Sequence, residues 1–169
     1  MKRHLITGSI AGILLAVAAG CDSKPKSSVP AERGEVTLKD YGAEAVVLNI
    51  EDYTMVNDNF RLALWTGTKL QLVLMSIPVR GHIGLEYHPD IDQFIRIEDG
   101  TARVTMGDSR DLLDYVQTAG KDSVILIPAG KWHDIVNVGD TPLKLYSIYA
   151  PPEHPHGTVE KEHDHSHHH

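Results

Sequence analysis

The sequence predicts an all-β fold, an antiparallel double-stranded β-helix or jelly-roll barrel, on three observations. Short runs of β-branched and aliphatic residues recur along the chain, separated by turn residues that include many of its 14 glycines and 9 prolines. The runs do not alternate with long helical periods, which argues against a parallel βαβ sheet. Segments 98–101 and 138–141 carry the Asp-Gly and Gly-Asp pairs typical of hairpin turns. Eight or nine strands at this spacing indicate an antiparallel barrel.

The expected strands all lie between residues 45 and 150. They are 45–49, 61–65, 70–77, 83–88, 93–97, 102–106, 123–128, 133–138 and 143–150. One further segment, 111–118, is a candidate for a helical turn. A chain of 169 residues is long enough for one domain with a core that folds unaided. We expect this domain to span residues 36–155.

Residues 1–20 are predicted to be an export signal. Lys2 and Arg3 give a basic start, and the apolar stretch 5–20 ends in small residues before Cys21. The stretch is shorter than the ~20 residues of a membrane-spanning helix. The alternatives are a transmembrane anchor or a buried core helix in which Cys21 is merely packed. The basic start, apolar run and small-residue exit occur together, which favours the signal.

The residues before Cys21 resemble a bacterial lipobox, with Ala18 at a position that usually holds leucine. The resemblance implies cleavage before Cys21 and a diacylglycerol on its sulfur, which would anchor the protein to a membrane. Residues 21–35 would then be a lipidated start and a polar tether rich in proline and serine. We therefore expect a protein of the cell envelope that faces the periplasm or the exterior. A single cysteine excludes an intramolecular disulfide.

The net charge of the chain limits the classes of partner that it can bind. The formal net charge is −7, and without residues 1–20 the remaining 14 basic and 23 acidic residues give −9. An acidic surface repels phosphate backbones, so nucleic acid is not expected as a partner. The expected partners are a small-molecule ligand and the membrane, the latter through the lipid on Cys21. A homodimer is left open.

Two stretches bring together residue types that bind metals. Glu86 and His88 alternate along a strand, so they share one face about 6.6 Å apart, and Gln93 begins the next strand. Further on, a turn with proline and glycine delivers His133 to the start of a strand, and Asn137 follows four residues later. The alternative interpretation is that Glu86 and Gln93 are solvated strand residues and His133 is an ordinary histidine beside a turn.

These stretches resemble the two motifs of the cupin family, and they are similar to a cupin subgroup with a Glu-x-His…Gln pattern. In cupins two histidines, a glutamate and a final histidine hold one divalent metal inside the barrel. The resemblance implies that Glu86, His88, Gln93 and His133 take these four places as metal ligands, supported by Asn137 at the end of the second motif. The glycine that opens each motif is replaced, by Arg80 in the first motif and by Asp122 in the second.

The implied ligand set keeps the single negative charge of the usual cupin site. It has fewer nitrogens and more oxygens, which favours Mn²⁺, Fe²⁺ or Zn²⁺ over copper. Cupins with such sites include oxygenases, isomerases and decarboxylases, and Glu86 is a candidate general base as well as a ligand. We therefore expect a small-molecule metalloenzyme of unknown substrate. The alternative is a non-catalytic envelope lipoprotein that binds a metal or another ligand.

Other polar and aromatic residues carry weaker signals. Arg61, Trp65, Tyr146 and Tyr149 are candidates to line a pocket, although such residues often serve packing alone. His82 lies about 13 Å along the strand from Glu86, too far to share a metal, and is expected at the barrel mouth. The tail 156–169 is rich in histidine. The alternative interpretations are a metal-gathering arm, a disordered tail or an engineered tag.

Overall fold

The structure is a computed structural model that describes residues 35–162. The predicted signal, Cys21 and residues 163–169 of the histidine-rich tail lie outside the described residues. Within the described part, no helix has the length and apolar character needed to cross a membrane.

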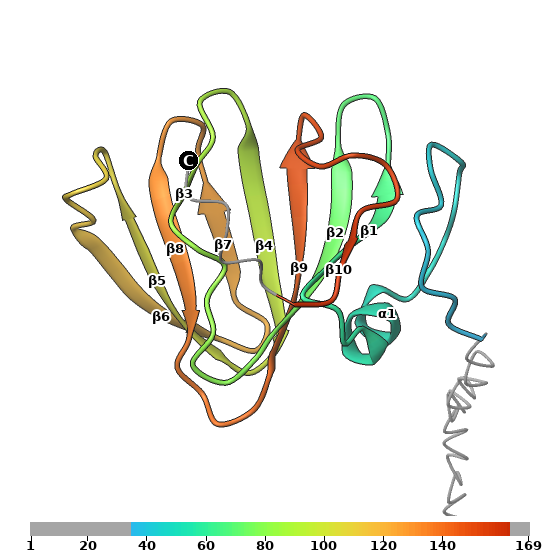
Figure 1. The fold of residues 1–169 in the computed structure, drawn as a ribbon, viewed down its shortest axis with the longest axis horizontal. Helices are drawn as coiled ribbons and strands as arrows, with labels where there is room; N and C mark the ends of the chain where they lie inside the picture. The colour runs from blue at the N-terminus through green and yellow to red at the C-terminus, as the bar shows by residue number, and fades with distance from the viewer. Residues whose placement is uncertain (1–34, 163–169) are drawn as a thin grey trace, which may run out of the picture. The chain divides into compact units, whose positions relative to one another are not determined.

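Two antiparallel sheets enclose a common core (Figure 1). The six-stranded sheet has the order β10 (Val159–Glu160), β1 (Arg61–Thr66), β2 (Gln71–Ile77), β9 (Leu143–Ala150), β4 (Asp92–Asp99) and β7 (Val124–Ile127). The four-stranded sheet has the order β3 (Glu86–Tyr87), β8 (Trp132–Asn137), β5 (Thr101–Gly107) and β6 (Tyr115–Gly120). The chain crosses repeatedly between the sheets, as in a double-stranded β-helix. The all-β prediction is confirmed.

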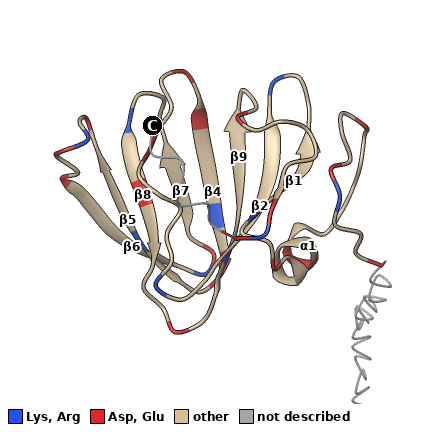
Figure 2. Cartoon of the chain, in the orientation of Figure 1, with Lys and Arg blue, Asp and Glu red and all other residues tan. Residues whose placement is uncertain are grey.

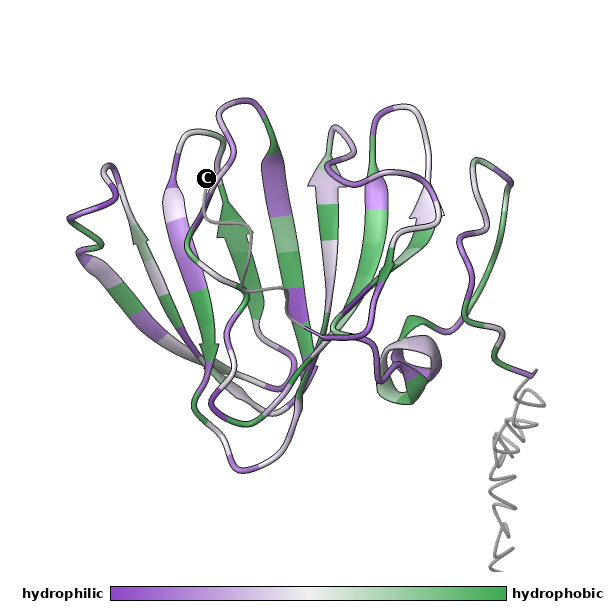
Figure 3. Cartoon of the chain, viewed as in Figure 1, coloured by the Kyte–Doolittle hydropathy of each residue, from purple (hydrophilic) through white to green (hydrophobic). Residues whose placement is uncertain are grey.

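Alternating side chains build the core from both sheets. Ile95 and Ile97 on β4 are fully buried, as are Val73 and Met75 on β2 and Ile135 on β8. Hydrophobic residues accordingly concentrate on the strands (Figure 3), while most acidic and basic residues lie in loops, at strand ends and on the helix (Figure 2).

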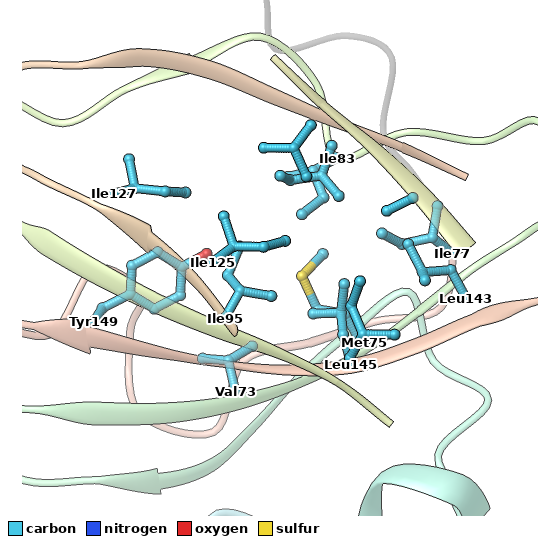
Figure 4. Packing of buried hydrophobic residues seen from close by; sticks show 14 of the residues in the cluster. Val73, Met75, Ile77, Ile83, Ile95, Ile125, Ile127, Leu143, Leu145 and Tyr149 are labelled. Carbon is cyan, nitrogen blue, oxygen red and sulfur yellow. The ribbon is translucent and has the colours of Figure 1, made fainter. Parts of the chain in front are cut away.

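The core cluster has two distinct ends (Figure 4). Ile77 and Leu143 lie at one end, and Ile127 and Tyr149 lie at the other. Tyr149 therefore marks where the apolar core gives way to polar side chains.

Several local expectations differ from the structure. Residues 45–49 form no strand, and the helix α1 (Ile50–Val56) follows them, begun by Asn49, whose side chain accepts a hydrogen bond from the Glu51 amide. The expected helical turn at 111–118 is wrong, because the second half of this segment belongs to the edge strand β6, whose exposed side chains give no burial pattern. Beyond residue 155, where the expected domain ended, β10 pairs with β1.

The two positions that replace motif glycines have glycine-like backbones. Arg80 and Asp122 have φ angles of 65° and 66°, and no other described residue except glycine has a positive φ. Each is the third residue of a turn closed by a backbone hydrogen bond, Gly81 to Pro78 in one case and Ser123 to Gly120 in the other. This is the position at which a type II turn favours glycine.

Candidate metal centre

Pairing of two short strands brings the histidine of the second motif against the first motif. In the register of β3 with β8, Glu86 lies directly opposite His133. His88 follows the end of β3 by one residue. One ligand atom from each of these three side chains lies within 4.8 Å of the others. Three of the four predicted ligands thus meet at one point.

The turn before β8 joins the two motifs through the backbone. The Gly130 amide donates to the His88 carbonyl at 2.7 Å, and Gly130 has a φ of 80° that favours glycine. The Ala129 amide donates to the Asp92 carboxylate at 2.9 Å. These bonds hold the turn against the chain that carries His88.

The same turn orients the ring of His133. Its Nδ1 lies 3.0 Å from the Lys131 carbonyl, and because a carbonyl only accepts, Nδ1 carries the proton. The lone pair of Nε2 is then free. This backbone partner on the far ring nitrogen is the arrangement that metal-binding histidines commonly have.

The converging atoms lack hydrogen-bond partners although they are buried. They are Oε2 of Glu86 and Nε2 of His88 and His133. Oε2 lies 3.6 Å from the His88 nitrogen and 3.7 Å from the His133 nitrogen, beyond hydrogen-bond distance. Buried polar atoms are rarely left unpaired in native proteins. Two imidazole nitrogens and a carboxylate oxygen fit a divalent metal.

His133, His88 and Arg61 together keep the carboxylate of the site ionised. The Arg61 guanidinium lies 3.3 Å from Oε1 of Glu86 and 2.7 Å from Glu160. Burial by itself would raise the pKa of Glu86, but contacts with His133 and His88 and the charge of Arg61 lower it to about 2. Glu86 is therefore an anion at neutral pH, with Oε1 facing Arg61 and Oε2 facing the histidines.

The other ring nitrogen of His88 faces a further carboxylate. Its Nδ1 lies 3.6 Å from Glu153. Burial would lower the pKa of His88, but the charges of Glu86 and Glu153 outweigh burial and raise it. A cation at this point, whether a proton or a metal, is therefore stabilised.

Gln93 lies on β4, in the other sheet from Glu86 and His133. Its side chain is buried, and its amide nitrogen donates to the Ser147 hydroxyl at 3.0 Å. The amide oxygen is buried and has no hydrogen-bond partner. It is thus free to act as a ligand, and its assignment as the fourth ligand stays a prediction.

The Asn137 side chain forms hydrogen bonds to two loops. Its amide nitrogen donates to the carbonyls of Ile77, Pro78 and Thr141, and its oxygen accepts from the Gly139 amide. These bonds tie the end of β8 to two loops. These partners are all backbone atoms, so the support that Asn137 gives to the site is indirect.

Of the four residues predicted as candidates to line a pocket, two reach the site and two do not. Arg61 and Tyr149 reach the site, since the Tyr149 ring lies edge-on to His88 at 5.8 Å between centroids. Trp65 donates to the Glu44 carbonyl, and Tyr146 stacks on Phe94. These latter two are therefore not part of the site.

His82 lies apart from the three clustered ligands. Its ring nitrogen is 3.4 Å from Asp134, and its side chain is 41% exposed, in keeping with the expected place at the rim.

A segment after β9 supplies residues that sequence reasoning missed. We call residues 151–162 the strap; it carries Glu153, His154 and Glu160. The His154 ring lies edge-on to Tyr149 at 5.2 Å, with its Nε2 buried and without a hydrogen-bond partner. Burial and the charge of Arg61 lower the pKa of His154 to about 4, so its imidazole is neutral at pH 7. The two histidines after the core strands were the available signal, but they were assigned to the end of the domain and the tail.

Buried side chains fix the strap in place. Gln71 donates to the His154 carbonyl at 2.8 Å and accepts from its amide at 2.9 Å. Asp40 accepts from the Gly157 amide at 2.9 Å and from the Thr66 hydroxyl at 2.6 Å. The hydrogen bonds from Gln71 to the His154 backbone therefore keep the His154 side chain beside the site.

Comparisons with known proteins agree with the fold. Residues 73–149 match the family model described as Cupin domain. The uncharacterized protein YrkC of Bacillus subtilis (strain 168) is 53% identical over 128 residues, which cover 76% of this chain and 69% of YrkC. The crystal structure of BH2720 from Bacillus halodurans has a TM-score of 0.72 and 55% identity, covering 73% of this chain and 93% of that one. The chain belongs to the cupin family.

A more distant structure shows the same fold alone. It is an uncharacterized Klebsiella pneumoniae protein with a double-stranded β-helix domain, 16% identical with a TM-score of 0.54. The match covers 70% of this chain and all of that one (100%). Arg61 and the strap lie outside residues 73–149, the part that matches the family model.

Proposed function

We propose that this protein is a lipid-anchored cupin metalloenzyme that acts on a small molecule. One divalent metal is held by Glu86, His88 and His133, with Gln93 as the fourth ligand. The observation that carries the proposal is the convergence of three buried ligand atoms, none with a hydrogen-bond partner. A carboxylate, an amide oxygen and two imidazoles favour Mn²⁺, Fe²⁺ or Zn²⁺ over copper.

A divalent ion in such a site supplies Lewis-acid or redox chemistry. The protein's own residues supply position and charge. His133 is oriented by the Lys131 carbonyl, and Arg61 holds Glu86 as an anion with Oε2 toward the site. Glu86 can therefore serve as a ligand or, off the metal, accept a proton at Oε2. The reaction classes that suit the site are those of oxygenases, isomerases and decarboxylases.

Elemental analysis of the purified protein tests the metal site. The tail histidines bind metals on their own, so all five at 163–169 are replaced by serine; we call this variant the Ser-tail protein. We expect one metal ion per chain, lost in His133→Ala and kept in the control His82→Ala, which changes a histidine outside the cluster. A Ser-tail protein that takes up no divalent metal would refute the proposal.

A non-catalytic binding lipoprotein is the second candidate, favoured by the five histidines of 163–169. In that case the tail gathers ions and the barrel stores or senses them. A chain ended at Glu162 keeps Glu160 on Arg61 and removes residues 163–169, which hold those five histidines. An enzyme should keep its metal affinity and activity after this change, whereas a delivery protein should lose metal capacity.

The lipid anchor is proposed from the sequence around Cys21. The change Cys21→Ser removes the thiol that would carry the lipid. We expect the variant to leave the membrane fraction and to keep its uncleaved signal. A variant that fractionates and migrates like the wild type would refute the anchor without touching the metal site.

A further inference from the structure

Three buried polar atoms beside the metal centre have no hydrogen-bond partner and are not among the proposed ligands. They are Nε of Arg61, the hydroxyl of Tyr149 and Nε2 of His154. The rings connect them to the site, since Tyr149 lies between His88 at 5.8 Å and His154 at 5.2 Å. Arg61 joins the same group through its contact with Glu86. We call these three residues the polar wall.

Burial or specific contacts fix each of the three residues of the polar wall in place. The Tyr149 side chain is fully buried, and the Gln71 side chain, also fully buried, binds both backbone polar groups of His154. Glu160 on β10 holds Arg61 at 2.7 Å. A rigid wall with three unpaired polar atoms is costly unless something else completes the hydrogen bonds.

The chemistry of the wall suits an anionic oxygen. Arg61 Nε and the Tyr149 hydroxyl donate hydrogen bonds, and a neutral imidazole can donate through Nε2. Three carboxylates surround the site, those of Glu86, Glu153 and Glu160. With a divalent ion bound, the ion and Arg61 together balance these three charges, so a monoanion can enter. Without the ion, the excess of negative charge would exclude it.

We propose that Arg61, Tyr149 and His154 bind the substrate, a small organic carboxylate, beside the metal centre. This inference rests on the proposed function and names the substrate class of that site. The three carboxylates beside the site are partly exposed, with 20%, 31% and 35% of the side chains of Glu86, Glu153 and Glu160 accessible, compared with 11% for Arg61.

The wall also gives this protein its own selectivity within the cupin family. Tyr149 is the last residue that matches the family model, and Arg61 and His154 lie outside the match. The metal ligands all lie inside it. Two of the three residues that would bind the substrate thus lie outside the family match.

The test uses the Ser-tail protein loaded with Mn²⁺ at less than one equivalent, with glycolate as the probe. The Mn²⁺ ion speeds relaxation of nearby ligand protons, so the broadening of the glycolate methylene signal reports binding beside the metal without any turnover. Ethylene glycol has the same methylene group without the charge, and inorganic phosphate is the competing anion. We expect glycolate to be broadened, ethylene glycol not, and phosphate to compete weakly.

Two variants probe the wall, each with a matched control. Tyr149→Phe and His154→Ala should each weaken glycolate binding by about 10-fold, because each removes a hydrogen bond to a charged group. Tyr146→Phe changes a tyrosine on the outer side of the same strand, and His156→Ala changes an exposed histidine of the strap that lies near Asp40. Both controls should bind glycolate as the wild type does. Mn²⁺ affinity, measured by chelator competition, should change less than threefold in all four variants.

The outcomes separate the two proposals. Absence of Mn²⁺ binding by the Ser-tail protein would refute the proposed function itself. Tight Mn²⁺ binding with equal glycolate broadening in wild type, Tyr149→Phe and His154→Ala would overturn the polar wall alone. Phosphate bound more tightly than glycolate would overturn the carboxylate class.

Discussion

In the proposed ligand set, Gln93 takes the place of the usual cupin glutamate and Glu86 provides the carboxylate. Gln93 enters from β4, and Glu86 from β3 in the other sheet, so the change moves the negative charge across the barrel. The Ser147 hydroxyl holds the amide nitrogen and leaves the oxygen free. Since a hydroxyl can donate as well as accept, Ser147 can also hold a glutamate at this position.

Substitutions at Gln93 should change metal affinity in a defined order. Gln93→Glu adds a second carboxylate beside Glu86, which attracts a divalent ion more strongly but repels Glu86 when the ion is absent. Gln93→Ala removes a neutral ligand, and His133→Ala removes a strong one. Chelator competition on the Ser-tail protein should rank Gln93→Glu tightest, then wild type, Gln93→Ala and His133→Ala. Metal-free Gln93→Glu should unfold at lower denaturant than metal-free wild type. If His133→Ala binds metal as tightly as wild type, the ligand assignment fails.

His154 should make the metal-free protein sensitive to acid. Its folded pKa of about 4 lies below the usual value of 6.5, so the unfolded chain takes up the proton first as the pH falls. Stability is therefore lost between about pH 6.5 and pH 4. Relative to His154→Ala, the wild type should lose about 2 kcal/mol between about pH 7.5 and pH 5. The measurement is urea unfolding at both pH values with a chelator present. Parallel pH profiles for the two proteins would show that His154 is not held neutral.

Among the structural elements, the two turns that open the motifs carry left-handed residues that are not glycine. Arg80 is exposed at the third position of its turn. Arg80→Gly should stabilise the protein by about 0.5–1 kcal/mol, because glycine removes the steric cost of a positive φ. Arg80→Ala keeps the Cβ atom and should give no gain in denaturant unfolding. Asp122 is a weaker candidate, since its carboxylate pairs with Arg96 at 2.7 Å and aspartate tolerates this conformation. If Arg80→Gly and Arg80→Ala changed the free energy of unfolding equally, the backbone of Arg80 would not be strained.

Strands that bury several side chains were predictable from the sequence, and the exposed or very short elements were missed. β4 and β8 alternate buried with more exposed positions and lie where they were expected. β6 is an edge strand held to β5 by backbone pairing, so its side chains carry no such signal. The helix α1 had a readable start at Asn49, whose side chain caps it. β10 has two residues, and only its pairing with β1 identifies it.

For the whole molecule, the core should hold the fold without the metal. The main hydrophobic cluster draws on both sheets and does not depend on the three ligands. Chelation should therefore lower the melting temperature while far-UV circular dichroism remains strand-like. A metal that binds only the folded state adds about 4 kcal/mol at a thousandfold excess over Kd. His133→Ala should show no such shift. Complete unfolding of the wild type by a chelator would mean that the metal is part of the core.

As with the fold, one part of the site was predictable from the sequence and another part was not. Glu86, His88 and His133 meet because strand alternation and one short pairing place them together, and motif spacing carries that information. Arg61 and His154 are far from the motifs in sequence. They reach the site through β1 and through the strap that Gln71 holds, which are tertiary contacts with no local signal. The clustering of Glu86, His88 and His133 was therefore predictable. Of the polar wall, Arg61 and Tyr149 were predicted only as candidates to line a pocket, and His154 was missed.

The position of the metal tests the account most directly. Crystals of the Ser-tail protein grown with Mn²⁺ can be measured for anomalous scattering from the ion. The account predicts one strong anomalous peak within ligand distance of Glu86 Oε2, His88 Nε2 and His133 Nε2, with the Gln93 oxygen as the fourth protein ligand. A metal-loaded crystal with no peak at that point, or with its peak elsewhere in the molecule, would contradict it.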